Sequence, residues 1–428
     1  MRFTMTGFPR TATWTTLTCL ALLAAGHAAG ADWLQWGGPA GDYTVPSAPL
    51  AENWPPGGPK RLWERTLGPG YSSILAKGDT LVTMYRAGND EVVVALGAAT
   101  GTTRWAHRDQ PVLWEEMTRE FGVGPNATPL IIGDRVVAIG ISGRMRCLDL
   151  ESGRLLWQRD LPADFGRRKR VEEYGYSGSP IAFDGAVIAL VGGDQAAVVA
   201  FDPKNGSTRW KSRPGGVSYA PPSIVRLAGE DQYVYFEPEG VAALDPRTGA
   251  LLWTAPIEFN NGNHLTPVVQ CDEHHLWVGS QFQTGGGRLL EITRQAERWS
   301  ARQLWFAAAM QTSHWPLIRV GEFIYGSIGG NSRSQLTAFR WKTGEVVWKR
   351  PGYHKAQALW ADGKLLFLDE SGQLVLGKAT PGGFEPLAQA RITEPISWSL
   401  PTLVGSTLYV RDQARIMALD LGSQPPGK

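Results

Sequence analysis

Short runs of apolar residues, separated by turns that contain glycine, recur along the chain at a period of about 40–50 residues. The segment 94–105 joins an apolar strand, a glycine turn and a strand ending in tryptophan, and segment 147–157 repeats this pattern. Further copies end at Trp210, Trp253 and Trp348. Self-similarity of this length, built from strand-like runs, predicts a radially repeated β architecture.

Each copy has the properties of a β-hairpin. In one of them, apolar Val199–Phe201 leads to Asp202, whose side chain can accept hydrogen bonds from the amides of the turn that it opens. Gly206 supplies the positive φ that such a loop needs, and Trp210 closes the return strand. Because two strands alone cannot bury a hydrophobic face, we expect neighbouring copies to stack against one another.

Another apolar strand opens each of eight copies, often after Ser, Thr or Pro. The eight openings are residues 71–74, 127–130, 178–181, 221–224, 265–268, 314–317, 357–360 and 399–402. A turn such as Gly133-Asp134 then leads into a second strand such as 135–139, which makes four strands for each copy. The pattern predicts an all-β, eight-bladed β-propeller of four-stranded blades, with two stacked β-sandwiches as the weaker alternative.

The two ends of the repeat region complement each other. The last copy stops after 416–421 without its glycine and tryptophan, whereas Lys60–Trp63 forms a fourth strand that no hairpin precedes. Pairing these strands in one blade removes the open sheet edges of an unclosed ring. We therefore expect a propeller over residues 60–421, an N-terminal extension over 32–59 and a C-terminal tail over 422–428.

With these repeats the chain resembles the quinoprotein-type β-propellers, the family of pyrroloquinoline quinone (PQQ) repeats, which carry a tryptophan docking motif of the form Ala-x-Asp-x-x-x-Gly-x-x-x-Trp. Residues 243–253 match the motif in full, the resemblance covers nearly all of 60–421, and 32–39 resembles the start of secreted bacterial propellers. The architecture is also similar to the lipoprotein subunit of the outer-membrane barrel-assembly machinery. The resemblance implies a docking role for Trp105, Trp157, Trp210, Trp253 and Trp348.

Three copies depart from this motif. The fifth has Glu291 and Trp305 without the turn glycine in place, the seventh has Leu387 where tryptophan belongs, and the eighth is truncated.

Residues 1–31 have the organisation of a cleavable signal peptide. Arg2 and Arg10 precede an apolar run at 17–25, and small residues at 29–31 fit a signal-peptidase site. The run is too short to span a bilayer. We therefore expect the mature protein to be periplasmic or secreted.

The low net charge of the chain argues against nucleic acid as a partner. A net charge of +2 on 428 residues provides no electrostatic field that would attract nucleic acid. The basic run 167–170 is followed at once by acidic residues, which favours a solvated loop.

Beyond the signal peptide, Cys147 and Cys271 lie on expected strands. Buried free thiols are the favoured interpretation, with a disulfide between them as the alternative.

Recognisable catalytic motifs are missing from the sequence. The quinoprotein dehydrogenases that the chain resembles use two adjacent cysteines and a calcium ion beside the quinone, and this chain has no Cys-Cys pair. It has no Cys-x-x-Cys-His, Gly-x-Ser-x-Gly or His-Glu-x-x-His motif, and His274 and His275 face opposite sides of their expected strand. We expect no cofactor, no metal and no catalytic residue.

The loops that lead into the first strands are polar and aromatic, and in a propeller they surround one mouth of the central channel. The predicted ligand-binding residues of this rim are Tyr71, Asn126, Tyr176, Tyr219, His264, Gln311, His314, Trp315, Lys355 and Trp398. Among them, Tyr176, Tyr219 and Trp315 are expected as stacking walls, and Asn126, Gln311, His264 and His314 as polar anchors. The alternative is that these residues merely cap the strands.

Two long connections are expected on the same side of the ring. Residues 114–121 have helix-compatible spacing and are expected to form a short amphipathic lid, and 164–174 form a polar loop.

Together these features favour a non-catalytic binding or scaffolding module. Its partner would be a periplasmic or envelope protein, or a small hydroxyl-rich ligand. The alternative is an oxidoreductase that acts on an alcohol or sugar with PQQ and calcium at the channel mouth, where His314 would remove a proton.

Overall fold

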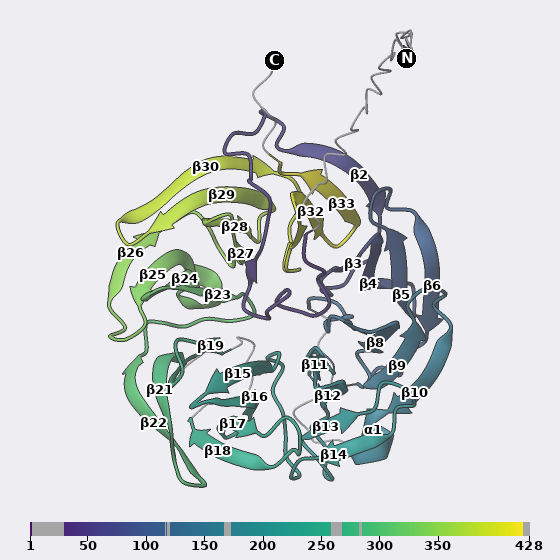
Figure 1. The fold of residues 1–428 in the computed structure, drawn as a ribbon, viewed down its shortest axis with the longest axis vertical. Helices are drawn as coiled ribbons and strands as arrows, with labels where there is room; N and C mark the ends of the chain where they lie inside the picture. Colours follow the sequence, from purple (N-terminus) through teal and green to yellow (C-terminus); the bar gives the residue numbers. More distant parts are fainter. Residues whose placement is uncertain are drawn as a thin grey trace.

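The computed structural model shows a closed ring of eight β-sheets around a central channel (Figure 1). It describes residues 1, 30–115, 117, 120–166, 173–257, 268–281 and 285–422. The predicted eight-bladed propeller is therefore confirmed. The basic run 167–170 and His264 lie outside the described residues. The same holds for nearly all of the predicted signal peptide.

The first four blades follow one another along the chain, and strands are antiparallel within each blade. Blade 1 contains β3 (Leu75–Lys77), β4 (Thr80–Ala87), β5 (Asp90–Gly97) and β6 (Thr103–Asp109). Blade 2 contains β7 (Leu130–Ile132), β8 (Arg135–Ile139), β9 (Arg144–Asp149) and β10 (Leu155–Asp160). After helix α1 (Leu161–Phe165), blade 3 contains β11 (Ile181–Phe183), β12 (Ala186–Leu190), β13 (Val198–Phe201) and β14 (Thr208–Lys211). Blade 4 contains β15 (Ser223–Leu227), β16 (Glu230–Glu237), β17 (Gly240–Leu244) and β18 (Leu251–Pro256).

The last four blades complete the ring. Blade 5 contains β19 (Val269–Gln270), β20 (His275–Ser280), β21 (Gly286–Gln295) and β22 (Arg298–Ala307). Blade 6 contains β23 (Leu317–Val320), β24 (Phe323–Ile328), β25 (Gln335–Arg340) and β26 (Val346–Arg350), with helix α2 (Gly330–Arg333) before β25. Blade 7 contains β27 (Gln357–Ala361), β28 (Lys364–Leu368), β29 (Gln373–Thr380) and β30 (Gly383–Arg391). Blade 8 contains β31 (Thr402–Val404), β32 (Thr407–Arg411), β33 (Arg415–Asp420) and β2 (Lys60–Thr66).

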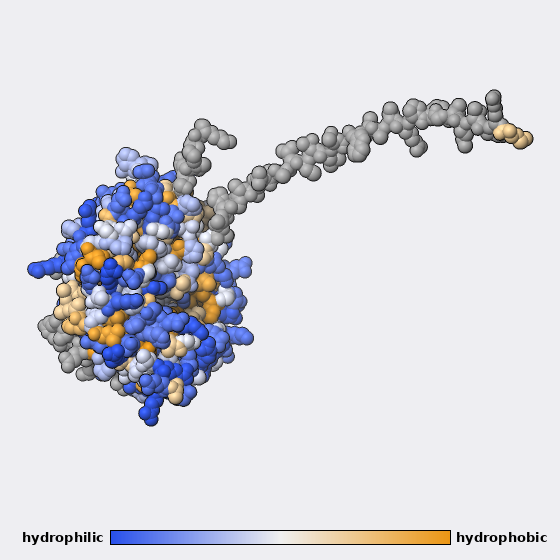
Figure 2. Space-filling model, turned by 60° about the vertical axis from the view of Figure 1, so that its left-hand side comes forward, coloured by the Kyte–Doolittle hydropathy of each residue, from blue (hydrophilic) through white to orange (hydrophobic). Residues whose placement is uncertain are grey.

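Burial along a blade explains its hydrophobic pattern. The middle strands β12 and β17 are buried at every position, because blades on both sides cover them, and they read as continuous apolar runs. The outermost strands carry many exposed residues, including Leu304, Phe306 and Val346. Figure 2 shows small hydrophobic groups among mostly polar atoms on one side of the molecule, as on an ordinary protein surface.

Blade 8 closes the ring in the predicted way. The N-terminal strand β2 pairs antiparallel with β33, with Lys60 opposite Asp420 and Thr66 opposite Arg415. The fully buried guanidinium of Arg411 also crosses to blade 1, where it donates hydrogen bonds to the carbonyl oxygens of Gly68 (2.9 Å) and Met84 (2.5 Å). The strand pairing covers the sheet edge of β33, and the Arg411 hydrogen bonds join blade 8 to the chain around blade 1.

Tryptophan side chains connect successive blades. The Trp105 indole N–H donates to the Leu150 carbonyl of blade 2 (2.9 Å), and a Cβ on Gly153 would lie 2.5 Å from the Trp105 ring. Only glycine therefore fits at that turn, which also has a positive φ. Equivalent hydrogen bonds to the next blade start from Trp63, Trp157, Trp210, Trp305 and Trp348.

Trp253 makes a different contact, because blade 5 lacks the turn glycine. Its indole N–H donates to Oε1 of Gln232 in its own blade (2.7 Å). The ten-residue strands β21 and β22 extend the blade 5 hairpin, and Trp299 packs in the same hydrophobic cluster as Trp253. Arg294 of this hairpin also forms an ion pair with Glu230 of blade 4. The longer hairpin thus replaces the usual connection between blades 4 and 5.

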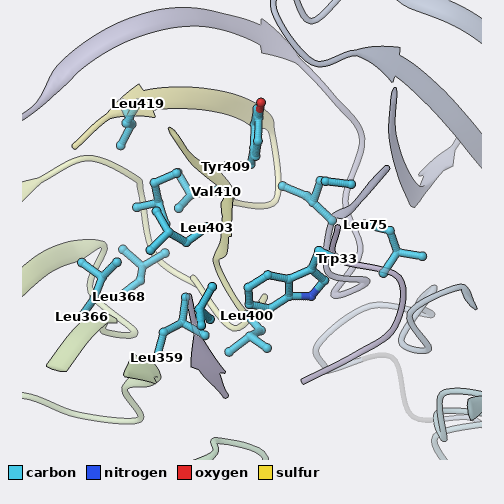
Figure 3. Packing of buried hydrophobic residues seen from close by; sticks show 14 of the residues in the cluster. Trp33, Leu75, Leu359, Leu366, Leu368, Leu400, Leu403, Tyr409, Val410 and Leu419 are labelled. Carbon is cyan, nitrogen blue, oxygen red and sulfur yellow. The ribbon is translucent and has the colours of Figure 1, made fainter. Parts of the chain in front are cut away.

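The N-terminal segment 33–51 lies inside the ring, although sequence analysis separated residues 32–59 from the propeller. Trp33 bridges to Ala76, and strand β1 (Thr44–Val45) adds parallel to β27 as a fifth, innermost strand of blade 7. In Figure 1 this purple segment crosses the centre of the ring. Figure 3 shows Trp33 among Leu75 and Leu400, and the Trp33 side chain is fully buried.

This segment contacts the ends of inner strands next to the turns that lead to the second strands, so we call that side of the ring the turn face. Along its path it binds blades 7, 8, 1 and 2, including an Ile131 N–H to Leu34 carbonyl bond of 2.8 Å. Blades 4, 5 and 6 are left with a cavity of about 330 Å³, walled on one side by Tyr43. The channel is therefore partly closed on the turn face.

Both described cysteines are buried free thiols. Burial raises the pKa of Cys147 to about 12, so its sulfur stays protonated and unreactive at neutral pH. Among the residues that the structure describes, no helix has the length and apolar character needed to cross a membrane.

Candidate binding site at the channel mouth

Three predicted rim residues surround the indole of a fourth, Trp398, on the face opposite the turn face, which we call the rim face. The Trp398 ring stacks on Tyr71, with centroids 5.4 Å apart, and lies 4.6 Å from the His314 ring. The Lys355 Nζ lies 5.1 Å from the Trp398 ring centre, within cation–π range. These residues precede the first strands of blades 1, 6, 7 and 8, so the channel mouth brings together side chains that are far apart in the sequence. We call Tyr71, Phe121, His314, Lys355 and Trp398 the mouth cluster.

Phe121 is the member of the mouth cluster that sequence reasoning did not select. Its ring lies 5.1 Å from Trp398, and its carbonyl accepts a hydrogen bond of 2.6 Å from the Tyr71 hydroxyl. Phe121 ends segment 114–121, whose apolar spacing was the available signal. No helix occurs among the described residues of that segment: Glu115 and Glu120 lie in turns, and Met117 is buried. The expected lid helix is therefore not found there.

Lys355 is held in an unusual backbone conformation. Its φ of 48° lies in the left-handed region, which is uncommon for residues other than glycine and concentrates at functional positions. The Ser334 hydroxyl accepts the Lys355 N–H (3.1 Å), and the Lys355 ammonium pairs with Glu370 at 2.5 Å. This pair neutralises the only cation of the mouth cluster.

His314 is neutral at physiological pH. Burial, followed by the charge of Lys355, lowers the pKa of His314 from its usual 6.5 to about 3. Its Nδ1 lies 3.3 Å from the Ser313 hydroxyl, and its Nε2 is inaccessible and lacks a hydrogen-bond partner in the described chain. The imidazole can therefore donate or accept one further hydrogen bond without carrying a charge.

A second group of predicted rim residues lies over blades 2, 3 and 4. The Asn126 side-chain amide donates to the Ser177 hydroxyl (3.0 Å), and the Tyr219 hydroxyl accepts the Tyr174 N–H (3.3 Å). Tyr176 and Tyr219 are both buried, and the Tyr176 hydroxyl donates to the Val191 carbonyl. The Asn126 and Tyr219 contacts connect neighbouring blades and the Tyr176 contact lies within blade 3, so the two buried tyrosines are not open stacking walls.

Trp315 and Gln311 take positions other than those expected. Trp315 is 0 % exposed, and its indole N–H donates to the Ser327 carbonyl at 2.6 Å, so blade 6 encloses the ring and leaves no face for stacking. The Gln311 carbonyl accepts the Gly329 N–H at 2.8 Å, which fixes its loop beside α2. The remaining predicted residue, His264, lies outside the described residues.

Hydroxyl groups explain why Ser and Thr recur at the start of the first strands. The Thr128 hydroxyl accepts the Ser73 N–H (2.9 Å), and the Ser179 hydroxyl accepts the Thr128 N–H (3.0 Å). The Thr402 hydroxyl donates to the Ile74 carbonyl at 2.5 Å. These bonds join the innermost strands of neighbouring blades, which single-blade sequence patterns do not reveal.

The described residues do not fit the PQQ and calcium site of the dehydrogenases that the chain resembles. Calcium requires several oxygen ligands. Within the described ranges, no group of three His, Cys, Asp or Glu side chains is arranged to hold a metal ion. The carboxylate of Glu370 is paired with Lys355, and the two described cysteines lie on different blades. The donor set at the mouth is instead neutral and aromatic.

Comparisons with known proteins give a consistent result. The sequence profile of the family described as outer membrane protein assembly factor BamB matches residues 55–217 and 89–350, more than half of the chain. The BamB of Moranella endobia is 28% identical over 268 residues, 60% of this chain and 65% of that protein. The BamB of Burkholderia pseudomallei is 29% identical over 42% of this chain and 44% of that protein. The chain thus matches less than two thirds of the length of these curated relatives.

Solved structures show the same fold at low sequence identity. The crystal structure of BamB from Moraxella catarrhalis has a TM-score of 0.58 at 16% identity, covering 85% of this chain and 99% of that one. A quinohemoprotein alcohol dehydrogenase from Pseudomonas putida HK5 has a TM-score of 0.62 at 12% identity, covering 93% and 81%. The profile match, together with the eight-bladed ring, leads to the conclusion that this chain belongs to the propeller family described as outer membrane protein assembly factor BamB.

Proposed function

We propose that this chain is a non-catalytic binding module of the bacterial envelope, which uses the rim face of its propeller to hold a protein partner. Its curated relatives are named outer membrane protein assembly factors, so the partner we propose is an envelope protein of outer-membrane assembly. The apolar run and small residues before Asp32 support export to the periplasm.

The neutral state of His314 carries the preference for binding over catalysis. A general base works best with a pKa near the working pH. Burial and Lys355 lower the pKa of His314 to about 3, so its imidazole is a weak base at neutral pH. Glu370, the other titratable partner at the mouth, forms an ion pair with Lys355. These groups support holding a ligand better than they support removing a proton from an alcohol.

Phe121 provides a sharp test of the rim face. Its side chain is 39% exposed at the mouth, whereas Val346 is 38% exposed on the outer strand β26, so the two form a matched pair. The purified chain starting at Asp32 would be titrated by biolayer interferometry against a barrel-assembly complex that lacks its own propeller subunit. We expect Phe121→Ala to weaken binding at least about tenfold and Val346→Ala to leave it unchanged, because buried aromatic anchors dominate interfaces.

Three outcomes contradict the proposal. The first is that the parent chain does not bind the complex, and the second is that both variants bind it like the parent. The third is saturable uptake of PQQ with calcium, together with dye reduction on an alcohol, which establishes the oxidoreductase.

A further inference from the structure

Five buried hydrogen-bonding atoms without partners belong to loops at the rim-face ends of blades 5, 6 and 8. They are Ser280 Oγ, Gln281 Oε1, Thr312 Oγ1, His314 Nε2 and Trp398 Nε1, and none has a hydrogen-bond partner within the described residues. Ser280 and Gln281 are at the end of β20, while Thr312 and His314 are in the segment that leads into β23. We call these five side chains the polar line.

Backbone and ring contacts connect the polar line from blade 5 to blade 8. The Thr312 N–H donates to the Ser280 carbonyl at 3.2 Å, which places the two loops side by side. Thr312 lies two residues before His314, and the His314 ring is 4.6 Å from Trp398. These contacts place the five groups on loops at the rim-face ends of blades 5, 6 and 8, whereas other buried unpartnered atoms, such as Tyr233 Oη, lie elsewhere in the ring.

Such a concentration needs a physical explanation. Buried polar side chains in native proteins are nearly always hydrogen-bonded, and each exception indicates strain, a role in function, or a bound molecule. Thr312 is 0% exposed and Ser280 only 2%, so bulk water does not satisfy their hydroxyl groups. The free-energy cost of removing these groups from water is met when the chain folds and not when a ligand binds. This is the expected property of a preorganised binding site.

The chemistry of the polar line selects a neutral ligand. Two hydroxyl groups donate and accept, the amide oxygen accepts, the indole N–H donates, and the low pKa of His314 keeps its imidazole uncharged. Glu370 already neutralises the Lys355 ammonium. A charged ligand would therefore find no free opposite charge in the mouth cluster. Ligand hydroxyl groups match this set because each can donate and accept.

We propose that the polar line binds a neutral polyhydroxyl ligand, a sugar or a short neutral oligosaccharide, beneath the mouth cluster. The rings of Trp398 and Phe121 supply the apolar surface that the C–H faces of a sugar ring pack against. This site goes beyond the proposed protein-binding role. It shares Phe121 with the rim face, but its hydrogen-bonding atoms are buried, so Thr312→Val tests it separately from Phe121→Ala.

Thr312→Val tests the proposal with little change in shape. The parent chain and variants would be titrated with methyl β-glucoside, maltotriose and N-acetylglucosamine, by saturation-transfer NMR and calorimetry. We expect the parent to bind at least one probe saturably and Thr312→Val to bind it at least about tenfold more weakly. The melting temperature should stay equal or rise, because valine removes an unpartnered hydroxyl.

Thr337→Val is the matched control in the same blade. Thr337 is equally buried at 0% exposed, but its hydroxyl donates to the Gln335 carbonyl at 2.9 Å. This variant should melt at a lower temperature and keep the parent's affinity. The proposal is overturned if the parent binds none of the three probes at millimolar concentration. It is also overturned if Thr312→Val lowers the melting temperature and leaves affinity unchanged, which would assign the polar line to ordered water.

Discussion

Replacing Trp33 with alanine tests whether the N-terminal segment is an integral part of the propeller. The indole is fully buried among Leu75, Leu359 and Leu400, residues of three different blades (Figure 3). Removing a buried Trp side chain costs about 3–5 kcal/mol through lost contacts and a residual cavity. We expect Trp33→Ala to lower the free energy of unfolding by that amount. If segment 33–51 detaches before the ring unfolds, the decrease is limited to the free energy with which this segment docks in the channel.

Trp33→Phe separates packing from polarity at the same position. The Trp33 N–H is buried without a partner in the described structure, and leaving a donor unsatisfied costs about 1–3 kcal/mol. Phenylalanine keeps much of the ring volume and removes this N–H, so the two effects oppose each other. We therefore expect the Phe variant to fall within about 1.5 kcal/mol of the parent, within the usual range for hydrophobic exchanges that keep most of the volume.

Urea denaturation followed by circular dichroism, with linear extrapolation, measures both variants. Limited proteolysis of the native state gives a second readout, since an undocked segment is cut well before the ring unfolds. A Trp33→Ala chain that unfolds within about 1 kcal/mol of the parent and resists protease would refute the seating of segment 33–51 in the channel.

The remaining predictions concern closure, blade packing and pH. Deleting residues from Arg415 onward removes β33 and leaves β2 unpaired, so we expect aggregation on size-exclusion chromatography; a soluble truncation that melts like the parent contradicts ring closure. Trp253→Ala should cost about 3–5 kcal/mol in urea unfolding and leave Gln232 Oε1 without its donor, and a cost below about 1 kcal/mol would contradict that burial. For His314 the pKa is lower in the folded chain, so the unfolded chain takes up the proton first and stability falls as pH drops from 6.5 toward 3. His314→Gln should lose less stability than the parent between pH 7 and pH 4, and equal losses would contradict the assignment.

The candidate site was only partly predictable from sequence. Tyr71, His314, Lys355 and Trp398 were selected because they precede the first strands, and the structure brings all four together. Trp315 was selected by the same rule but lies enclosed in blade 6. Position in a repeat places a residue on the rim face, whereas the direction of its side chain depends on contacts with other loops.

The fold itself was determined by local sequence features. Alternation of apolar runs with turns set the four strands of each blade, and the recurring glycine and tryptophan set their number and order. Counting strands predicted closure through Lys60–Trp63. The incomplete last copy lacks a fourth strand and the N-terminal strand lacks a hairpin, so pairing the two completes one blade. These features can be read from the sequence because each depends either on residues within one blade or on the requirement that every blade contains four strands.

Only the tertiary structure decided the use of the channel. The seating of segment 33–51 and the line of unpartnered groups from Ser280 to Trp398 join residues from different blades, and the charge pair of Lys355 with Glu370 joins two separate loops of blade 7. No repeat pattern encodes such contacts, because each blade contributes only one or two of the groups. Burial then changes their chemistry, as in the low pKa of His314, and burial is a property of the assembled ring rather than of any one repeat.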